Sequence, residues 1–223
     1  MEGNRIENGN NEKMFSNKEN ISILTSLLWL HGVKKAVVCP GSRNAAIVHN
    51  LNESTWIKCY PVTDERSAGF DALGMIQASG DPVAVCVTSG TALLNLAPVV
   101  AEARYQHLPL VVISADRPQA WIGQQDGQTL EQSGALGRYV KYSVSLPAPR
   151  DGGPIHIKVP VSEPLFEFTA EGHPFERQIS YVPPMIDIEK VSKKMIKGFF
   201  EAIRPMIVIG QLSYRDDAEP LLE

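Results

Sequence analysis

Short apolar runs alternate with longer amphipathic stretches along most of the chain. Five runs have the length of buried strands, namely 36–39, 56–62, 83–88, 108–114 and 155–159. Apolar residues at helical spacing occupy a segment that ends at Gly32, and then 43–51, 66–78 and 92–105. Strands and helices that alternate at such short intervals predict an α/β fold, in which a doubly wound parallel sheet is covered by helices on both faces.

Local signals refine three of these elements. Ser16 and Glu19 have the spacing of a capping box, which predicts the start of the first helix. Pro98 lies inside the apolar segment 92–105, and an interior proline costs a helix about 3 kcal/mol, so we expect that helix to kink or split. The run 155–159 alternates in polarity and is closed by Pro160, which favours an edge strand or a late strand.

The composition changes near both ends of the chain. Residues 1–15 are polar and rich in Asn, so we expect a disordered tail. The alternating pattern then predicts one domain over 16–183, whose last part is extended and punctuated by proline. Residues 186–203 have the pattern of an amphipathic helix and 206–210 that of a buried strand. We therefore expect 184–223 to hold a linker helix and the first strand of a truncated second domain.

Charge and hydropathy exclude several classes of protein. The 21 basic and 25 acidic residues give a net charge of −4, which argues against a nucleic-acid partner. No apolar run approaches the roughly 18–20 residues of a membrane span, and the polar start lacks an apolar signal core, so we expect a cytoplasmic protein. The three cysteines, Cys39, Cys59 and Cys86, are interpreted as small core residues rather than as a disulfide or a metal site.

Polar loops follow the first four predicted strands, at 40–44, 63–66, 88–91 and 114–118. In a parallel sheet all four loops would meet at the carboxyl edge, where ligands bind in open α/β folds. We expect a helix after each loop, and helix N-termini favour anions. Arg43 in the first loop and Arg117 in the fourth add guanidinium groups with the geometry for carboxylate or phosphate. The pattern therefore predicts a site for an acidic ligand.

Each of these loop residues also has a purely structural interpretation. Ser42, Ser89 and Asp116 have side chains that cap helices, and Asp64 and Glu65 would complement a helix dipole without binding any ligand. The recurrence of such residues in four successive loops favours binding. Neither a G-x-G-x-x-G motif nor a Walker A loop is present, so the sequence supports neither a dinucleotide nor an ATP site.

Several motifs resemble the N-terminal pyrimidine-binding domain of thiamin-diphosphate-dependent enzymes. They are PGSRN at 40–44, TDER at 63–66, TSGTALLNLAPVVAEA at 88–103, SADRP at 114–118, GQTLEQSGALG at 127–137, IHIKVPVSEPL at 155–165 and RPMIVIG at 204–210. The resemblance covers roughly residues 17–215. Many thiamin enzymes share TSGT, whereas PGSRN together with SADRP is similar to the branch that serves menaquinone biosynthesis.

The resemblance implies roles for individual residues. Glu65 matches the catalytic glutamate that hydrogen-bonds N1′ of the aminopyrimidine. The positions expected to contact the cofactor are Glu65, Thr88, Ser89, Gly90 and Gln128, and those expected to contact substrate are Ser42, Arg43, Arg117 and Gln128. Gly127 stands where related enzymes carry Asn, which alters one expected cofactor contact.

The resemblance also implies a reaction and its partners. With thiamin diphosphate and Mg²⁺, such an enzyme decarboxylates 2-oxoglutarate and joins the resulting succinyl-carbanion equivalent to isochorismate. Both substrates are acids, which suits arginines at the sheet edge. The segment 92–105 matches a helix near the family's subunit interface, so a homodimer or tetramer is expected.

One part of the family's machinery is missing from the sequence. The family holds diphosphate and Mg²⁺ with a Gly-Asp-Gly motif followed by Asn, and this sequence has none. We therefore expect no metal ligand here, an N-terminal piece of a longer enzyme, and no activity or appreciable cofactor affinity for the piece alone. The alternatives are another thiamin-dependent decarboxylase or carboligase, and a non-catalytic binding module that kept the fold.

Overall fold

A computed structural model describes residues 13–144, 155–172, 193, 196–198 and 200–203. The chain divides into two compact units, 1–179 and 180–223, which are described separately. The helices of the first unit are α1 (Glu19–Leu30), α2 (Ala45–Glu53), α3 (Glu65–Ser79), α4 (Thr91–Leu94) and α5 (Ala97–Tyr105). Its strands are β1 (Lys35–Val38), β2 (Lys58–Pro61), β3 (Val83–Val87), β4 (Leu110–Asp116), β5 (Tyr142–Val144) and β6 (Ile155–Pro160).

These strands form one parallel sheet in the order β2-β1-β3-β4-β6-β5. Val38 at the end of β1 lies beside Cys86 of β3, and Ser114 of β4 lies between Val87 and Lys158. All carboxyl ends therefore meet at one edge. The chain order reverses between β1 and β3, and such a switch point is where open α/β sheets bind ligands.

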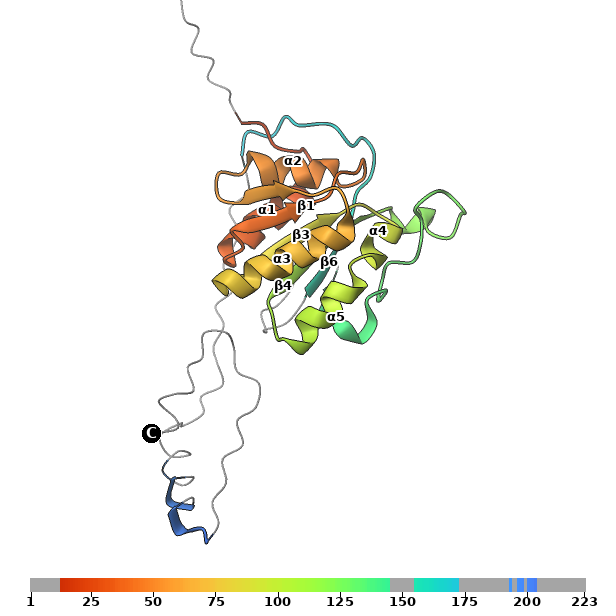
Figure 1. Cartoon of the computed structure of the whole chain (residues 1–223). Helices are drawn as coiled ribbons and strands as arrows, with labels where there is room; N and C mark the ends of the chain where they lie inside the picture. Colours follow the sequence, from red (N-terminus) through yellow and green to blue (C-terminus); the bar gives the residue numbers. More distant parts are fainter. Residues whose placement is uncertain (1–12, 145–154, 173–192, 194–195, 199, 204–223) are drawn as a thin grey trace, which may run out of the picture. The chain divides into compact units, whose positions relative to one another are not determined.

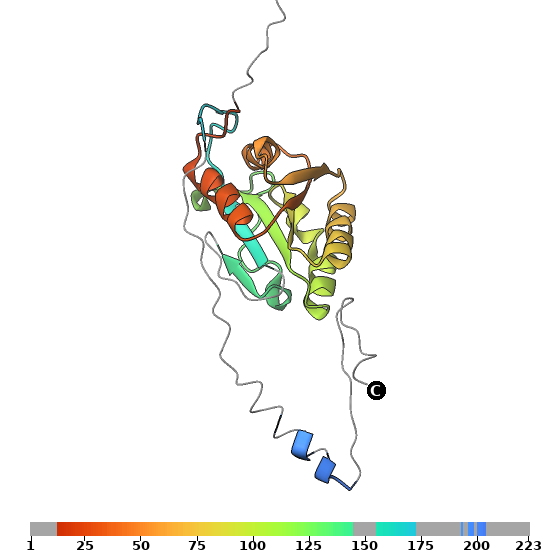
Figure 2. The same cartoon turned by 90° about the vertical axis from the view of Figure 1, so that its left-hand side faces the viewer.

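Helices cover both faces of the sheet, as the sequence predicted (Figure 1). The pleat sends alternate side chains of β3 to opposite faces. Ala84 and Cys86 pack with α1 and α2, whereas Val85 and Val87 pack with α3, α4 and α5. Figure 2 shows α1 and α3 on opposite sides of the sheet. The fold is the expected doubly wound one.

The split at Pro98 is confirmed. The segment forms α4 and α5, and Pro98 is the second residue of α5. In the first turn of a helix an amide has no intrahelical acceptor, so a residue without an N–H loses nothing there. The break at Asn95 and Leu96 thus explains how the segment tolerates its proline.

One local prediction is wrong, and another holds in only one of its two alternatives. Lys18 is the N-cap residue of α1, and no side chain caps that helix; the Ser16 hydroxyl instead accepts the Lys18 amide at 3.3 Å, so Ser16 and Glu19 form no capping box. The strand predicted at 155–159 is indeed late, but β6 lies inside the sheet because β5 covers it. Three residues of β5 are too few to show a period in the sequence.

The structure describes little of the second unit. Residues 193, 196–198 and 200–201 are helical, within the segment 186–203 that was predicted to be a helix. The predicted strand 206–210 and nearly all of the predicted tail, residues 1–12, lie outside the described residues. The proposed domain boundaries stay predictions. Across the residues that are described, no helix is long and apolar enough to cross a membrane.

Candidate functional site

Three contacts join the predicted loops at the carboxyl edge. A Cβ built on Gly41 would lie 2.5 Å from Thr88 Cβ, so the loop after β1 touches the loop after β3. A Cβ on Gly90 would lie 3.0 Å from Gln128 Cβ, and Gln128 itself is exposed. Arg117 Nη2 donates to the Gly127 carbonyl at 3.1 Å. The loops 40–44, 88–91 and 114–118 therefore meet one another and the segment around Gln128.

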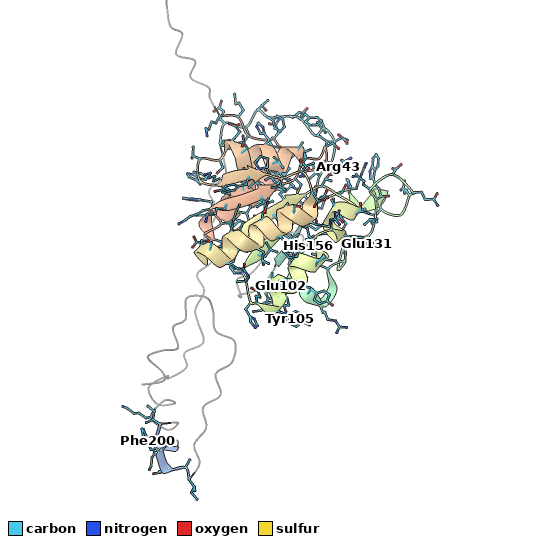
Figure 3. All side chains as sticks on the ribbon, viewed as in Figure 1. Arg43, Glu102, Tyr105, Glu131, His156 and Phe200 are labelled. Carbon is cyan, nitrogen blue, oxygen red and sulfur yellow. The ribbon has the colours of Figure 1, made fainter. Side chains whose placement is uncertain are left out.

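Arg43 is buried at the edge where these loops meet, and Figure 3 labels it. Its Nη1 donates to the Val161 carbonyl at 3.0 Å and lies 3.2 Å from the Glu163 carboxylate. Glu163 is 62% exposed, so water screens this ion pair. Arg43 Nε is buried and has no partner. The arginine is thus held in place on one side while a donor stays available.

Arg117 is held in the same manner, next to a buried pair of opposite charges. Its backbone amide donates to Asp116 Oδ1 at 2.8 Å, and its Nε is buried without a partner. Lys158 Nζ lies 3.4 Å from Asp116 Oδ2 and donates to Ser133 Oγ at 3.1 Å. Burial raises the pKa of Asp116, and the backbone amide of Arg117 and the Lys158 charge oppose that rise.

Glu65 is the first residue of α3 and is half-buried. Its Oε2 accepts from Asn95 Nδ2 at 3.1 Å, a contact made possible by the break between α4 and α5. Burial raises the pKa of Cys39 to about 12, and the charges of Glu65 and Asp64 add to that rise. Glu65 therefore lies near the end of β1, on the edge that carries Arg43.

Asp64 caps a helix, whereas none of the three residues interpreted as caps, Ser42, Ser89 and Asp116, does so. Asp64 caps α3 by accepting the Ser67 amide at 2.9 Å, and that hydrogen bond lowers the pKa of its carboxyl. Ser42 and Ser89 are not caps, because α2 begins after Asn44 and α4 after Gly90. Asp116 is the last residue of β4 and is fully buried.

The expectation of a helix after every loop is wrong at one place. The residues after β4 form only a 3-10 turn, Gln119–Trp121, whereas the loop after β3 leads into the short helix α4. Proline at 118 and the Gly- and Gln-rich segment behind it offer no helical period. Among the described residues no helix end therefore lies at that part of the edge, where Arg117 supplies the positive charge.

Buried polar atoms without partners concentrate at this edge. Within the described residues seven buried side-chain N or O atoms have no hydrogen-bond partner, and one of them, His31 Nε2, lies elsewhere. The remainder are Arg43 Nε, Asn44 Oδ1, Thr88 Oγ1, Ser89 Oγ, Asp116 Oδ2 and Arg117 Nε, of which Asp116 Oδ2 already faces the Lys158 charge at 3.4 Å. Since native structures satisfy most buried polar groups, such a concentration is typical of a place where a polar ligand completes the bonding.

Sequence patterns missed three residues that shape this edge. Gln132, Asn95 and Lys158 contact Gly90, Glu65 and Asp116 respectively. Lys158 lies in the predicted strand 155–159, and alternation of polarity in a strand does not indicate which charged residues form ion pairs. Gln132 and Asn95 lie inside motifs that carried the resemblance, but only the fold shows what they contact.

Metal ligands form no cluster in the described part of the chain. No group of three or more His, Cys, Asp or Glu side chains there is arranged to hold an ion. The residues at the carboxyl edge suit the organic end of a cofactor and carboxylates, with donors on arginines and hydroxyls and the Glu65 acceptor on the same edge. They do not fit Mg²⁺, so no step is assigned to the metal here.

The fold and the unsatisfied groups at its carboxyl edge define a ligand-binding α/β domain of the doubly wound class. A sequence model of the family described as thiamine pyrophosphate enzyme, N-terminal TPP binding domain, matches residues 22–135, and the chain belongs to this family.

Curated relatives narrow the comparison. A protein of Phocaeicola vulgatus named 2-succinyl-5-enolpyruvyl-6-hydroxy-3-cyclohexene-1-carboxylate synthase is 48% identical over 222 residues, covering 90% of this chain and 40% of its own length. Proteins of the same name from Bacteroides thetaiotaomicron and Porphyromonas gingivalis are 46% and 38% identical, covering 90% and 94% of this chain and 40% of their own lengths. The chain thus spans about 40% of the length of these relatives.

Proposed function

We propose that this chain supplies the pyrimidine-binding and acid-binding half of a thiamin-diphosphate-dependent synthase. In the proposed reaction 2-oxoglutarate loses carbon dioxide and the succinyl-carbanion equivalent is joined to isochorismate, a step of menaquinone biosynthesis. The carboxyl-edge cluster of unsatisfied buried atoms carries the proposal, because it offers donors for carboxylates beside an acid that suits a heterocycle. The names of the relatives support the same reaction.

Glu65 is proposed to hold a proton at N1′ of the aminopyrimidine. When bound, thiamin diphosphate supplies the electron sink that accepts the charge left by decarboxylation. Asn95 donates to Glu65 Oε2 at 3.1 Å, which leaves Oε1 to share a proton with a ring nitrogen. Thr88, Ser89 and Gly90 are proposed to line the pyrimidine, where the hydroxyls of Thr88 and Ser89 have no protein partner.

Arg43 and Arg117 are proposed to bind the substrate carboxylates, together with Ser42 and Gln128. Each arginine has one nitrogen tied to a backbone carbonyl and a buried Nε that still needs an acceptor. A guanidinium that is already oriented loses little side-chain entropy when it binds an anion. Gln128 lies against Gly90, so this side chain is proposed to reach both substrate and cofactor.

A second copy of the chain is proposed to cover the outer surface of α3, α4 and α5. Phe70 on α3 is 49% exposed, Leu94 on α4 is 42% exposed and Tyr105 at the end of α5 is 70% exposed. Exposed large apolar side chains on these three helices support the proposal, because contiguous apolar surface is typical of sites that bind other proteins. Sedimentation velocity at several concentrations tests this: a Leu94→Glu variant is expected to weaken self-association, and a monomer at every concentration would contradict it.

Assays with a completed enzyme test the proposed reaction. Diphosphate and Mg²⁺ are proposed to bind outside this chain, so residues 1–223 would be joined to the rest of the Phocaeicola vulgatus relative, hereafter the joined protein. We expect the joined protein to consume 2-oxoglutarate and isochorismate together, and the 223-residue chain to show no turnover. Micromolar binding of thiamin diphosphate by the chain alone, or turnover with another acceptor acid but not isochorismate, would contradict this assignment.

A further inference from the structure

A chain of hydrogen bonds, buried except at its outer end on the exposed Ser143, runs from the outer strand of the sheet to the loop after β3. Ser143 Oγ on β5 lies 3.1 Å from His156 Nδ1, and His156 Nε2 lies 2.7 Å from Ser114 Oγ on β4. Gln132 Nε2 donates to Ser114 Oγ at 3.2 Å, and Gln132 Oε1 accepts the Gly90 amide at 2.6 Å. Four side chains thus connect the sheet interior to one backbone N–H.

Gln132 is the link that reaches the loop. Its side chain is fully buried, and its Nε2 also donates to the Ala115 carbonyl at 3.0 Å. Both N–H groups of Gln132 Nε2 are therefore used, one by Ser114 Oγ and one by the Ala115 carbonyl. These two bonds orient the amide so that its nitrogen faces β4 and its oxygen faces Gly90. A flipped amide would set Nε2 against the Gly90 N–H and Oε1 against the Ala115 carbonyl, two repulsive contacts.

The histidine completes the chain as a neutral group. Burial is the larger cause, and the Lys158 charge the smaller, of a fall in the His156 pKa to about 4. Ser114 Oγ accepts from Gln132, so its own hydrogen is free to go to His156 Nε2, and Nδ1–H then donates to Ser143. In this arrangement both nitrogens of the neutral His156 ring have a hydroxyl partner.

Gly90 needs this support because its backbone is unusual. It has φ 86° and ψ −140°, and its amide makes the hydrogen bond to Gln132 across 42 residues of sequence. Helix α4 begins directly after it, while Gln128 lies against its Cα. A hydrogen bond from a rigid, buried amide therefore determines where the loop between β3 and α4 stands.

We propose that Gln132 is a positioning residue: its side-chain amide, oriented by Ser114 and the strand behind it, holds the Gly90 N–H and so sets the geometry of the Thr88–Gly90 loop. The consequence for the cofactor rests on the proposed function, in which this loop lines the pyrimidine. The hydrogen bond itself does not rest on it. Gln132 acts through Gly90 and is not assigned any contact with substrate or cofactor.

Amide hydrogen exchange of the 223-residue chain, read by NMR, tests the positioning role without any cofactor. Gln132→Met keeps the length of the side chain and removes the acceptor. We expect the Gly90 amide of this variant to exchange at least about fivefold faster relative to that of Val85 in β3, the factor for one hydrogen bond of ordinary net strength. Gln124→Met, at an exposed position of the same segment, is the matched control and should leave the ratio unchanged.

Two further variants keep the proposal testable if Gln132→Met does not fold. Gln132→Glu retains an oxygen for Gly90 and loses both donors to β4, so the Gly90 resonance is expected to shift while part of its protection remains. Ser114→Ala removes one of the two acceptors of Gln132 Nε2 and should give a smaller increase in exchange. Equal exchange ratios in wild type and all folded variants would overturn the proposal, as would a uniform increase across β3 that leaves the ratio unchanged.

The joined protein separates this inference from the proposed function. There Gln132→Met is expected to raise the Kd for thiamin diphosphate at least tenfold, while the 2-oxoglutarate KM changes less. Faster Gly90 exchange with an unchanged cofactor Kd would keep Gln132 as the residue that positions the loop and would remove the loop from the cofactor site. Unchanged Gly90 exchange would overturn the positioning role, whatever the cofactor binds.

Discussion

Replacing Gly90 with alanine should destabilise the domain through two separable effects. The first is backbone strain, because φ 86° with ψ −140° is a conformation that residues with a Cβ rarely adopt. The second is crowding, because the new Cβ would lie 3.0 Å from Gln128 Cβ and 3.1 Å from Gln128 Cα. Both effects act at the loop that the proposed site depends on.

The expected size follows from adding the two effects. Strain of this kind costs about 1–3 kcal/mol, and an extra methyl in a packed place costs about 1–3 kcal/mol. Alanine restricts the unfolded chain and returns about 0.4–1 kcal/mol. We therefore expect Gly90→Ala to lower the free energy of unfolding by about 1–5 kcal/mol, which lowers Tm by roughly 2–20 °C for a chain of this size.

Three matched glycines separate the effects in urea denaturation followed by circular dichroism. Gly41→Ala adds crowding alone, since its Cβ would lie 2.5 Å from Thr88 Cβ. Gly123→Ala adds strain alone, with φ 81° and no atom within 4 Å. Gly74→Ala, in the middle of α3 with nothing within 4 Å, adds neither and should stabilise by about 0.5–1 kcal/mol. If Gly90→Ala lies within about 0.5 kcal/mol of Gly74→Ala, the account of this loop is wrong.

Two further predictions concern buried charges. His156 has a pKa of about 6.5 in the unfolded chain and about 4 in the folded one, so the stability that its neutral form contributes is present above pH 6.5 and falls as the pH drops toward 4. Urea titrations should show a loss of roughly 2–3 kcal/mol in the free energy of unfolding between pH 7.5 and 4.5, and His156→Gln should not show this loss. Equal pH profiles for the two proteins would contradict this prediction. Lys158→Met leaves the buried Asp116 without its counter-charge and should lower the free energy of unfolding by about 3 kcal/mol in the same urea titrations. The double variant Lys158→Met with Asp116→Asn should recover most of this loss. A double variant that is no more stable than Lys158→Met would show that the unpaired Asp116 charge is not the cause.

Most of the fold could be predicted because strand and helix periods were strong. The runs 36–39, 83–88 and 108–114 are buried on both faces, so their β-branched residues form continuous apolar segments, and the helices between them have clear apolar stripes. The place of β6 in the sheet could not be predicted, for a physical reason. Strand β5 has three residues, and only pairing with β6 makes it a strand, so the interior place of β6 was not visible in its own alternation.

The candidate site was predictable in its location and not in its internal contacts. Parallel topology alone puts the ends of β1, β3 and β4 at one edge, which located Arg43, Thr88 and Arg117. Whether a residue such as Gln132 faces solvent or fills the interior depends on how an irregular segment folds back onto the sheet. No period or spacing encodes such a path, so the partner of Gly90 had to come from the three-dimensional structure.

The central claim is that Glu65 at the carboxyl edge holds a proton at N1′ of the aminopyrimidine. Exchange of the C2 proton of thiamin diphosphate bound to the joined protein tests this claim most directly. The variant Glu65→Gln keeps the shape of the side chain and cannot supply a carboxyl proton. We predict that its exchange rate, measured with the cofactor fully bound, falls at least about 100-fold below that of the unmodified joined protein. An exchange rate within twofold of the unmodified protein would contradict the account.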